Sequence, residues 1–373
     1  MTTTFSQSRR YSSVVERIIG NDEVGSSILP CGTILMTLFP DISPFETGFH
    51  PTGDGHSLYW ERCGQKGGIP VVFLHGGPGS GCTPTHRRYF DPDVYDVVLF
   101  DQRGCGRSRP VFSLDGNTTQ NQIADIEALR SLFGFERWIV VGPSWGSALA
   151  LAYAEACPTA VSGLLVEGIF LASDKELAWW HYRPGAPSLF PDAFEDFLGG
   201  KGAPDHMNVR DFFASICNAM QEEIDIRMPD LQRLSDPSIT LTELRRSPLY
   251  RWTEYENRLS WLEASPEHVR HSLAARGPDF VASHSLIEAH YFANGCFLKP
   301  DQLISNTDRL AGIPMEIIQS RYDMVCPPEA AFRLKAACPH ARLTLIQKNG
   351  HAMTDAVFPA LITSLARLAA GAA

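Results

Sequence analysis

One serine of this chain lies between two glycines in a setting that suits nucleophilic catalysis. The segment "IVVGPSWGSALALAYAEACP" contains Gly142-x-Ser144-x-Gly146, with an apolar run before it and a helix-compatible run after it. A nucleophilic serine needs a sharp turn between a strand and a helix, and glycines two positions away on either side let the two elements approach closely. The alternative is a tight turn without chemistry. The flanking strand and helix patterns favour the nucleophile.

A serine hydroxyl is a weak nucleophile at neutral pH, so it needs a base that is itself oriented by an acid. Asp323 in "MEIIQSRYDMVCPPE" and His351 in "LTLIQKNGHAM" each follow a predicted strand. Taken singly, the aspartate could be a turn residue and the histidine a structural one. Their joint order after Ser144 is the order of an α/β-hydrolase, and it predicts a triad of Ser144, Asp323 and His351.

Two glycine-rich turns could support this chemistry. "VVFLHGGPGSG" follows a predicted strand upstream of the serine, and it lacks the lysine and the spacing of a phosphate-binding loop. We therefore predict an oxyanion hole made by backbone N–H groups of Gly76 and Gly77, with Gly77 favoured, and of Trp145. The second turn, "FDQRGCGRS", is interpreted as a scaffold turn whose arginine and aspartate side chains form ion pairs.

These residues must be positioned by a larger frame. Short, nearly continuous apolar runs predict strands buried on both faces of a parallel sheet. The runs are Val71–His75, Val97–Asp101, Trp138–Gly142, Leu164–Glu167, Met315–Gln319 and Leu343–Gln347. Helices are predicted between them, at Asn121–Phe133 and Ser147–Ala156. The alternation predicts a doubly wound, mostly parallel α/β sheet of the α/β-hydrolase fold.

The character of the chain changes between Phe170 and Pro300, where helix-compatible, aromatic-rich segments replace the strand runs. We predict a helical cap inserted into one α/β core. The predicted division is an N-terminal extension over 1–36, the first part of the core over 37–170, the cap over 171–300 and the second part of the core over 301–373.

Composition narrows the classes of partner. The 32 basic and 42 acidic side chains give a net charge of −10, which argues against nucleic-acid and anionic-membrane surfaces and favours small molecules or peptides. Nine scattered cysteines without a C-x-x-C pair predict reduced thiols in a cytoplasm, with no zinc site. No apolar stretch is long enough to span a membrane. The sequence leaves the oligomeric state open.

Several segments, in the same order, resemble the proline iminopeptidases (prolyl aminopeptidases) of the α/β-hydrolase superfamily. They are "PFETGFHPTGDGHSLYWERCG", "VVFLHGGPGSGC", "FDQRGCGRS", "SWGSALALAYAEACP", "GIF", "RPGAPSLFPDAFEDFL", "EAHYF" and "RYDMVCPPEAA". The resemblance implies release of an N-terminal residue, usually proline, from peptides without a metal or another cofactor. It also implies that Ser144, Asp323 and His351 form the triad.

The same resemblance assigns two glutamates of the cap to the free amino terminus of the substrate. They are Glu256 in "RWTEYENRLSW" and Glu288 in "IEAHYF". An ammonium group that leaves water requires close carboxylates. Without the resemblance, both glutamates would be interpreted as solvated residues on helix faces.

The chain also departs from the family pattern. Pro143 precedes the serine where the family usually has glycine, and Glu167 precedes "GIF" where it usually has arginine. Gln319 and Ser320 replace a histidine and a glycine before "RYD". Pro143 and Glu167 leave one alternative to a strict proline aminopeptidase, an amidase, esterase or acyl-transferring serine hydrolase of a specialised pathway. A separate alternative is a binding protein without turnover, which is disfavoured because such proteins usually lose a triad residue and all three are present here.

Overall fold

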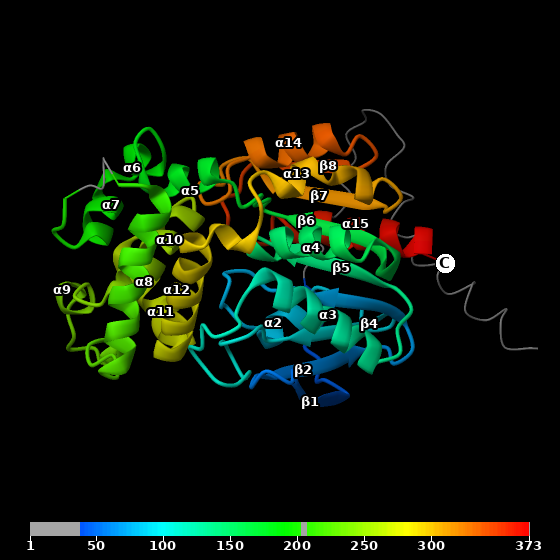
Figure 1. Ribbon diagram of the computed structural model, residues 1–373, viewed down its shortest axis with the longest axis horizontal. Helices are drawn as coiled ribbons and strands as arrows, with labels where there is room; N and C mark the ends of the chain where they lie inside the picture. The colour runs from blue at the N-terminus through cyan, green and yellow to red at the C-terminus, as the bar shows by residue number, and fades with distance from the viewer. Residues whose placement is uncertain (1–37, 203–206, 373) are drawn as a thin grey trace, which may run out of the picture.

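One eight-stranded sheet forms the centre of the core in a computed structural model that describes residues 38–202 and 207–372 (Figure 1). The predicted N-terminal extension lies outside the described residues. The strands, in chain order, are β1 (Glu46–Pro51), β2 (Ser57–Gly64), β3 (Ile69–Phe73), β4 (Tyr95–Phe100), β5 (Trp138–Pro143), β6 (Val161–Glu167), β7 (Met315–Ser320) and β8 (Arg342–Ile346). The α/β-hydrolase prediction is confirmed by this architecture.

The strand order in the sheet is β1-β2-β4-β3-β5-β6-β7-β8. The six strands from β3 onward in the chain run parallel to one another. The first two strands form antiparallel pairs, β1 with β2 and β2 with β4. The predicted strand runs correspond to those six parallel strands. The two antiparallel strands escaped prediction because their burial alternates along the strand, so they carry no continuous apolar run.

Both faces of the parallel strands β3 to β7 are largely buried, as their sequences predict. For β8 the prediction of burial on both faces is wrong, because this strand lies at the edge of the sheet and is only partly buried. Val72 and Leu74 pack into one hydrophobic cluster, whereas Val71 and Phe73 of the same segment pack into the other. The helices and 3-10 turns that belong to the core are α2 (Pro84–Arg87), α3 (Thr119–Leu132), α4 (Trp145–Ala156), η1 (Pro158–Ala160), α14 (Glu329–Ala337) and α15 (Phe358–Ala372). Residues of α3, α4 and α14 pack on the first face, and α15 packs on the second.

Every described element between β6 and β7 is helical. These elements are α5 (Asp174–His181), α6 (Ala186–Leu189), α7 (Pro191–Leu198), α8 (Val209–Asp225), η2 (Leu231–Arg233), α9 (Leu241–Leu244), α10 (Pro248–Ser260), α11 (Pro266–Arg276), α12 (Pro278–Ala293), η3 (Gly295–Phe297), α13 (Gln302–Ser305) and η4 (Thr307–Leu310). In Figure 1 the helices α6 to α12 lie to one side of the sheet. We call α5 to α12 the cap, and the domain boundaries stay predictions.

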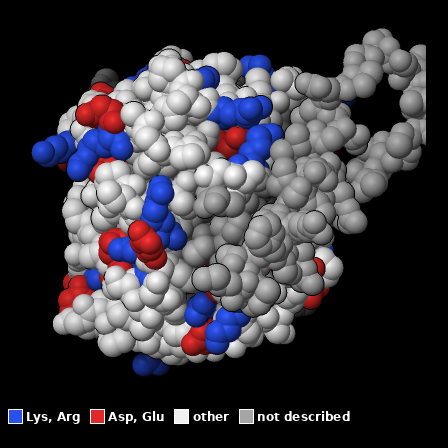
Figure 2. Space-filling view, turned by 90° about the vertical axis from the view of Figure 1, so that its right-hand side faces the viewer, with Lys and Arg blue, Asp and Glu red and all other residues white. Residues whose placement is uncertain are grey.

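Basic and acidic side chains are intermixed over the face in Figure 2, outside the grey atoms. Within the described ranges, no helix combines the length and apolar character that crossing a membrane requires.

Candidate active site

Ser144 occupies a strained turn between β5 and α4. Its backbone has φ 55° and ψ −126°, a conformation that residues with side chains rarely adopt. The flanking glycines are required by close packing, because a Cβ at Gly142 would lie 2.0 Å from the carbonyl oxygen of Gly146. A Cβ at Gly146 would lie 2.0 Å from the carbonyl oxygen of Leu74. Helix α4 begins directly after the serine, two residues before its predicted start.

The predicted acid and base lie within hydrogen-bonding distance of one another and of the serine. His351 Nε2 lies 3.0 Å from Ser144 Oγ, and His351 Nδ1 lies 2.8 Å from Asp323 Oδ2. The other oxygen of Asp323 accepts hydrogen bonds from the backbone N–H groups of Val325 (3.0 Å) and Cys326 (2.7 Å). Asp323 follows β7 and His351 follows β8, so adjacent parallel strands bring both side chains to one edge of the sheet.

The environment of His351 makes it a strong base. Burial alone would lower the pKa of the imidazole, but the charge and the hydrogen bond of Asp323 outweigh it, and the pKa rises to about 9. Glu167 and Glu256 add to this increase. The arrangement can take a proton from a serine hydroxyl and return it to a leaving group.

The predicted oxyanion residues lie around the same serine. Gly77, Trp145 and Ser144 line one cavity, and a Cβ on Gly76 would lie 3.3 Å from that of Ser144. Trp145 is the first residue of α4, and N–H groups in the first turn of a helix have no partner within that helix. A carbonyl oxygen between the two loops would therefore find donors from both sides.

The turn after β4 contacts both the glycine-rich loop and the first residue of α4. The Gln102 side chain donates to the carbonyl oxygen of His75 (2.9 Å) and accepts from the indole of Trp145 (3.1 Å). Arg107 pairs with Asp101 within the turn (2.7 Å), and Arg103 pairs with a more distant aspartate. Internal pairing is therefore confirmed for Arg107 with Asp101, whereas Arg103 pairs with aspartates outside the turn.

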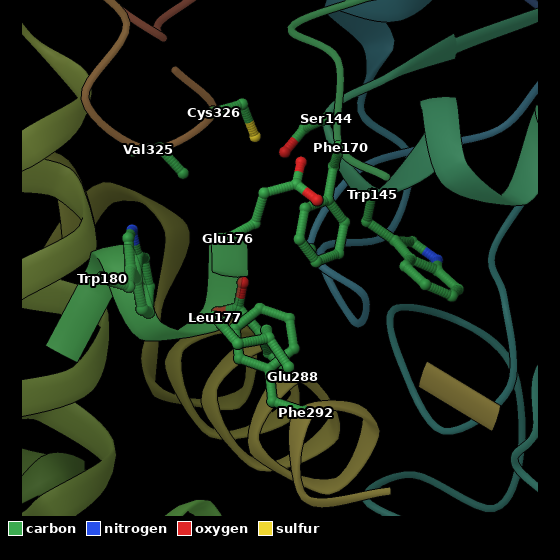
Figure 3. Close-up of a pocket in the computed structure, with 11 residues that line it drawn as sticks. Ser144, Trp145, Phe170, Glu176, Leu177, Trp180, Glu288, Phe292, Val325 and Cys326 are labelled. Carbon is green, nitrogen blue, oxygen red and sulfur yellow. The ribbon is translucent and has the colours of Figure 1, made fainter. Parts of the chain in front are cut away.

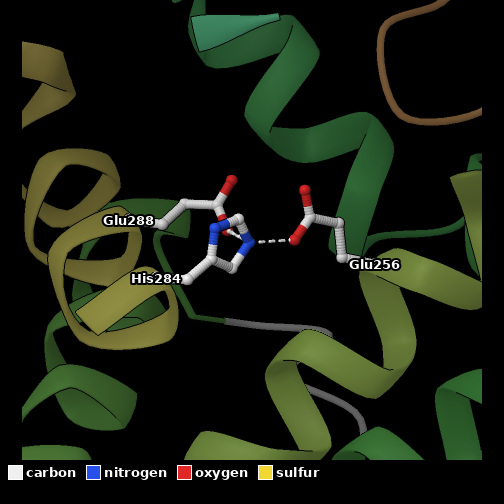
Figure 4. A group of neighbouring side chains, drawn as sticks. All are labelled: Glu256, His284 and Glu288. Atoms are coloured by element: carbon white, nitrogen blue, oxygen red, sulfur yellow. Dashed lines mark hydrogen bonds and ion pairs between the residues drawn. The ribbon is translucent and has the colours of Figure 1, made fainter. Parts of the chain in front are cut away.

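The two cap glutamates are buried, so their interpretation as solvated helix-face residues is wrong. Glu256 of α10 and Glu288 of α12 are 8% and 3% exposed. In Figure 4 the imidazole of His284 lies between their carboxylates. His284 Nε2 contacts Glu256 Oε2 and lies 3.6 Å from Glu288 Oε2, and the indole of Trp252 donates to Glu288 (2.6 Å).

This cluster can hold a cation. The ligand atoms of Glu256, His284 and Glu288 lie within 4.8 Å of one another. Burial and the negative charge of Glu256 raise the pKa of Glu288 well above its usual range. Burial would also raise the pKa of Glu256, but the charge and hydrogen bond of His284 lower it below its ordinary value. A buried carboxylate pair of this kind is stabilised by any positive charge that enters between the two groups.

A narrow cavity connects the serine to the cap. Figure 3 shows the aromatic rings of Phe170, Trp180 and Phe292 around it, with Ser144 and Cys326 on one side. The residues that line the cavity are Gly77, Ser144, Trp145, Phe170, Glu176, Leu177, Trp180, Glu288, Phe292, Val325 and Cys326. The cavity is thus largely apolar, with a nucleophile and the two carboxyl groups of Glu176 and Glu288 at its wall.

Several of these residues carry signals that sequence reasoning did not use. Phe170 belongs to "GIF", Cys326 is three residues after Asp323, and Phe292 is four residues after Glu288. Residues four apart on a helix share a face, so Phe292 and also His284 could have been found from the position of Glu288.

The departures from the family pattern lie next to the triad. The backbone carbonyl of Glu167 accepts from the N–H of Ser144 (2.8 Å), and its side-chain Oε1 is buried without a partner among the described residues. Burial, with the charge of Asp323, raises the pKa of Glu167 to about 8, against the opposing effect of His351. Gln319 donates to Asp323 Oδ2 (3.3 Å), so it supports the acid directly.

The chain resembles known proteins over most of its length. Residues 69–354 match the alpha/beta hydrolase fold family. A probable proline iminopeptidase from Leptolyngbya boryana is 40% identical over 337 residues, which are 89% of this chain and 97% of the relative. A proline iminopeptidase from Arabidopsis thaliana is 38% identical, over 86% of this chain and 78% of the relative.

A solved structure of similar fold is that of a proline iminopeptidase-related protein from Thermus thermophilus. It has a TM-score of 0.57 and 20% identity, and the match covers 87% of this chain and 99% of that one. This likeness concerns the fold, whereas the identity to the curated relatives concerns the family. The chain belongs to the alpha/beta hydrolase fold family and, within it, to the proline iminopeptidases.

Proposed function

We propose that the protein is a serine aminopeptidase that releases an N-terminal residue, most readily proline, from small peptides or amino-acid amides. Ser144, His351 and Asp323 are its catalytic triad, and the backbone N–H groups of Gly77 and Trp145 form the oxyanion hole. The observation that carries the proposal is the cavity that joins Ser144 to the buried Glu288. A free amino terminus in this cavity would meet the Glu288 carboxyl group while the carbonyl carbon of its residue faces the nucleophile.

The reaction begins when Ser144 Oγ attacks the carbonyl carbon of the first residue and His351 Nε2 takes the hydroxyl proton. The carbonyl oxygen becomes negatively charged, and the two backbone N–H groups stabilise it. His351 then returns the proton to the nitrogen of the leaving peptide, and the C–N bond breaks. Asp323 keeps the imidazole oriented and stabilises its positive charge.

Water completes the cycle by hydrolysing the acyl-enzyme. His351 removes a proton from the water as it attacks the ester carbon, and it then protonates Ser144 Oγ as the ester bond breaks. The released product is the free N-terminal amino acid. The closed sequence of proton transfers needs no cofactor beyond the residues named.

The cavity explains why one small residue would be accepted. Its aromatic walls, Phe170, Trp180 and Phe292, enclose a small apolar volume, which suits a compact ring such as that of proline. The cap glutamates would bind the ammonium of that residue, so the enzyme would recognise its substrate by the free amino terminus. A blocked amino terminus would bring no positive charge to these two groups, so it would lose that interaction.

The eight described cysteines carry free thiols. This supports an enzyme that works in a reducing compartment such as the cytoplasm.

A substrate panel tests the proposal. We expect prolyl arylamides with a free amine to be hydrolysed and their N-acetylated counterparts to be poor substrates. Ser144→Ala should reduce kcat by a factor on the order of 10⁶. The matched control is Ser131→Ala, at an exposed position of α3, which should behave like the wild type. Equal hydrolysis of free and acetylated substrates would contradict an aminopeptidase and leave a general serine hydrolase.

A further inference from the structure

Two buried carboxyl groups of the cap lack the arginine partner that other buried acids of this protein have. Glu256 and Glu288 are 8% and 3% exposed, and among the described residues neither forms an ion pair with lysine or arginine. Arg276 acts on Glu256 by its charge, but its guanidinium lies over the ring of Phe280. The buried acids that pair with arginine are Glu61, Asp96, Asp101, Asp125 and Glu254. Because a buried carboxylate needs a close positive charge, the ionised pair in the cap can accept a cation from outside.

His284 adds a nitrogen ligand to the same two carboxylates. It stands one turn before Glu288 on α12, and its imidazole lies between the carboxylates in Figure 4. Its Nε2 lies 3.6 Å from Glu288 Oε2, and the three ligand atoms lie within 4.8 Å of one another. In a tetrahedral zinc site with bonds of about 2.1 Å, the ligand atoms are about 3.4 Å apart. Nε2 also contacts Glu256 directly, so that glutamate must draw back to admit an ion.

The ligands are oriented by partners outside the cluster. His284 Nδ1 lies 3.0 Å from Ser80 Oγ, and the indole of Trp252 donates to Glu288 Oε2 (2.6 Å). Metal-binding histidines usually have such a partner on the other ring nitrogen. A neutral imidazole is sufficient here. Its proton moves from Nε2 to Nδ1 when an ion enters, and the Ser80 hydroxyl, which can donate or accept, keeps its contact.

The cavity gives an ion access to this position. Glu288 lines the cavity that also reaches Ser144, so an ion bound to Glu288 is approached from the substrate side. Three protein ligands leave a tetrahedral ion one open position, which water from the cavity can fill. One imidazole and two carboxylates suit a transition metal better than Mg²⁺ or Ca²⁺, which take oxygen ligands.

We propose that Glu256, His284 and Glu288 form a site for a divalent transition-metal ion such as Zn²⁺, which inhibits the enzyme by competing with the amino terminus of the substrate. This inference rests on the proposed function, because the ion and the ammonium use the same carboxylates. The ion carries two positive charges and balances both carboxylates, whereas one ammonium balances only one. The prediction of no zinc site rested on the cysteines, and none of them takes part here.

Metal binding is measured first, without reference to activity. The full-length Ser144→Ala protein is titrated with Co²⁺, which absorbs visible light in a tetrahedral site of nitrogen and oxygen ligands. Thiolate ligands add a charge-transfer band in the near ultraviolet, so binding to cysteines is recognised. We expect one such site, and His284→Gln should weaken it at least about tenfold. His290→Gln is the matched control, since it makes the same change on the same helix at a residue that contacts the carbonyl of Asn117.

Competition is the second measurement, and it needs no change in the cluster. Prolinamide should weaken Co²⁺ binding to the Ser144→Ala protein as its own occupancy rises, whereas N-acetylprolinamide should not. Ser80→Ala keeps all three ligands and removes only the hydroxyl beside Nδ1, so it should weaken Co²⁺ binding by about tenfold. This variant replaces His284→Gln if circular dichroism shows that the latter does not fold.

Kinetics of the wild type supply the third measurement. Zn²⁺ at ten times its Kd should raise KM for prolyl arylamide about elevenfold and leave kcat unchanged, and EDTA should reverse the effect. Mg²⁺ at the same concentration should have no effect. A fall in kcat with KM unchanged would overturn the proposal, as would Co²⁺ binding that neither His284→Gln nor prolinamide weakens.

The outcomes separate the two proposals. A wild type that does not hydrolyse prolyl arylamide refutes the proposed function, and Co²⁺ binding to the cluster can still be measured. An active wild type that binds no Co²⁺ at His284 refutes the inference alone. Loss of activity when metal is removed would also refute it, because the ion would then be required for catalysis.

Discussion

The molecule pairs a histidine with a carboxylate twice, once in the core and once in the cap. In the core, His351 meets Asp323, whose second oxygen receives two backbone N–H groups. In the cap, His284 is shared by two glutamates, and within the described part of the chain their carboxylates receive hydrogen bonds from side chains alone. The core pair is satisfied by itself, whereas the cap cluster has one more carboxylate than it has histidines.

The different surroundings of the two histidines suit two different functions, proton transfer in the core and cation binding in the cap. A proton relay needs one fixed orientation and one fixed charge, which backbone donors supply because they cannot rotate away. A binding site for a cation needs negative charge that the free protein only partly neutralises. The two regions can therefore be tested against one another with substitutions that remove a single charge and keep the shape.

The largest effect is expected for the core acid. Asp323→Asn keeps both backbone hydrogen bonds to Oδ1 but no longer favours the required tautomer of His351, so kcat should fall by a factor on the order of 10⁴. The loss should be the same for free and acetylated substrates, because the step concerned is proton transfer. Stopped-time assays with prolyl and N-acetylprolyl arylamides measure it. A change confined to KM would show that Asp323 does not act through the histidine.

A smaller and more selective effect is expected in the cap. Glu288→Gln removes a buried carboxyl group that would ionise beside a substrate ammonium, so kcat/KM for free-amine substrates should fall by about 30-fold or more, which corresponds to about 2 kcal/mol. Acetylated substrates should be little affected, in contrast to the result for Asp323→Asn. The control is Glu263→Gln, at an exposed position. Equal losses on both substrate types would assign Glu288 a structural role.

The smallest effect concerns the pH profile. The base form of His351 is required, and its pKa is raised to about 9, so kcat/KM should rise with pH and level off above about 9. Ionised Glu167 contributes to that increase, so Glu167→Gln should lower the pKa of His351 and move the rise to lower pH, by about one unit or less. Rates across pH 6 to 10 measure the shift. An unchanged or alkaline-shifted profile would contradict the effect of Glu167.

Most of the core, with its parallel strands and the triad, could be predicted from the sequence. Continuous apolar runs on both sides of Ser144 require a sheet covered on two faces, and the parallel strands bring Asp323 and His351 to the same edge. Because chain order and strand order together determine that edge, three residues could be grouped before their distances were measured, although the first and the last of them are 207 positions apart.

The site residues of the cap could be predicted from the sequence far less well. Glu256 and Glu288 lie in helices whose patterns suit a solvated face as well as a buried one, and the family resemblance was the only signal that singled them out. His284 carried no signal by itself, because the position of its imidazole depends on how α10, α12 and the loop containing Ser80 pack.

The sequence by itself determined the parallel α/β sheet, the serine turn and the order of the triad, since these depend on local runs and on the direction of the chain. Only the tertiary structure decided that the two glutamates are buried, that His284 lies between them and that Phe170, Trp180 and Phe292 enclose one cavity. The physical reason is that helix packing determines which helix faces meet. Contacts between helices that are distant in the chain produce no periodic pattern of residue types in the sequence.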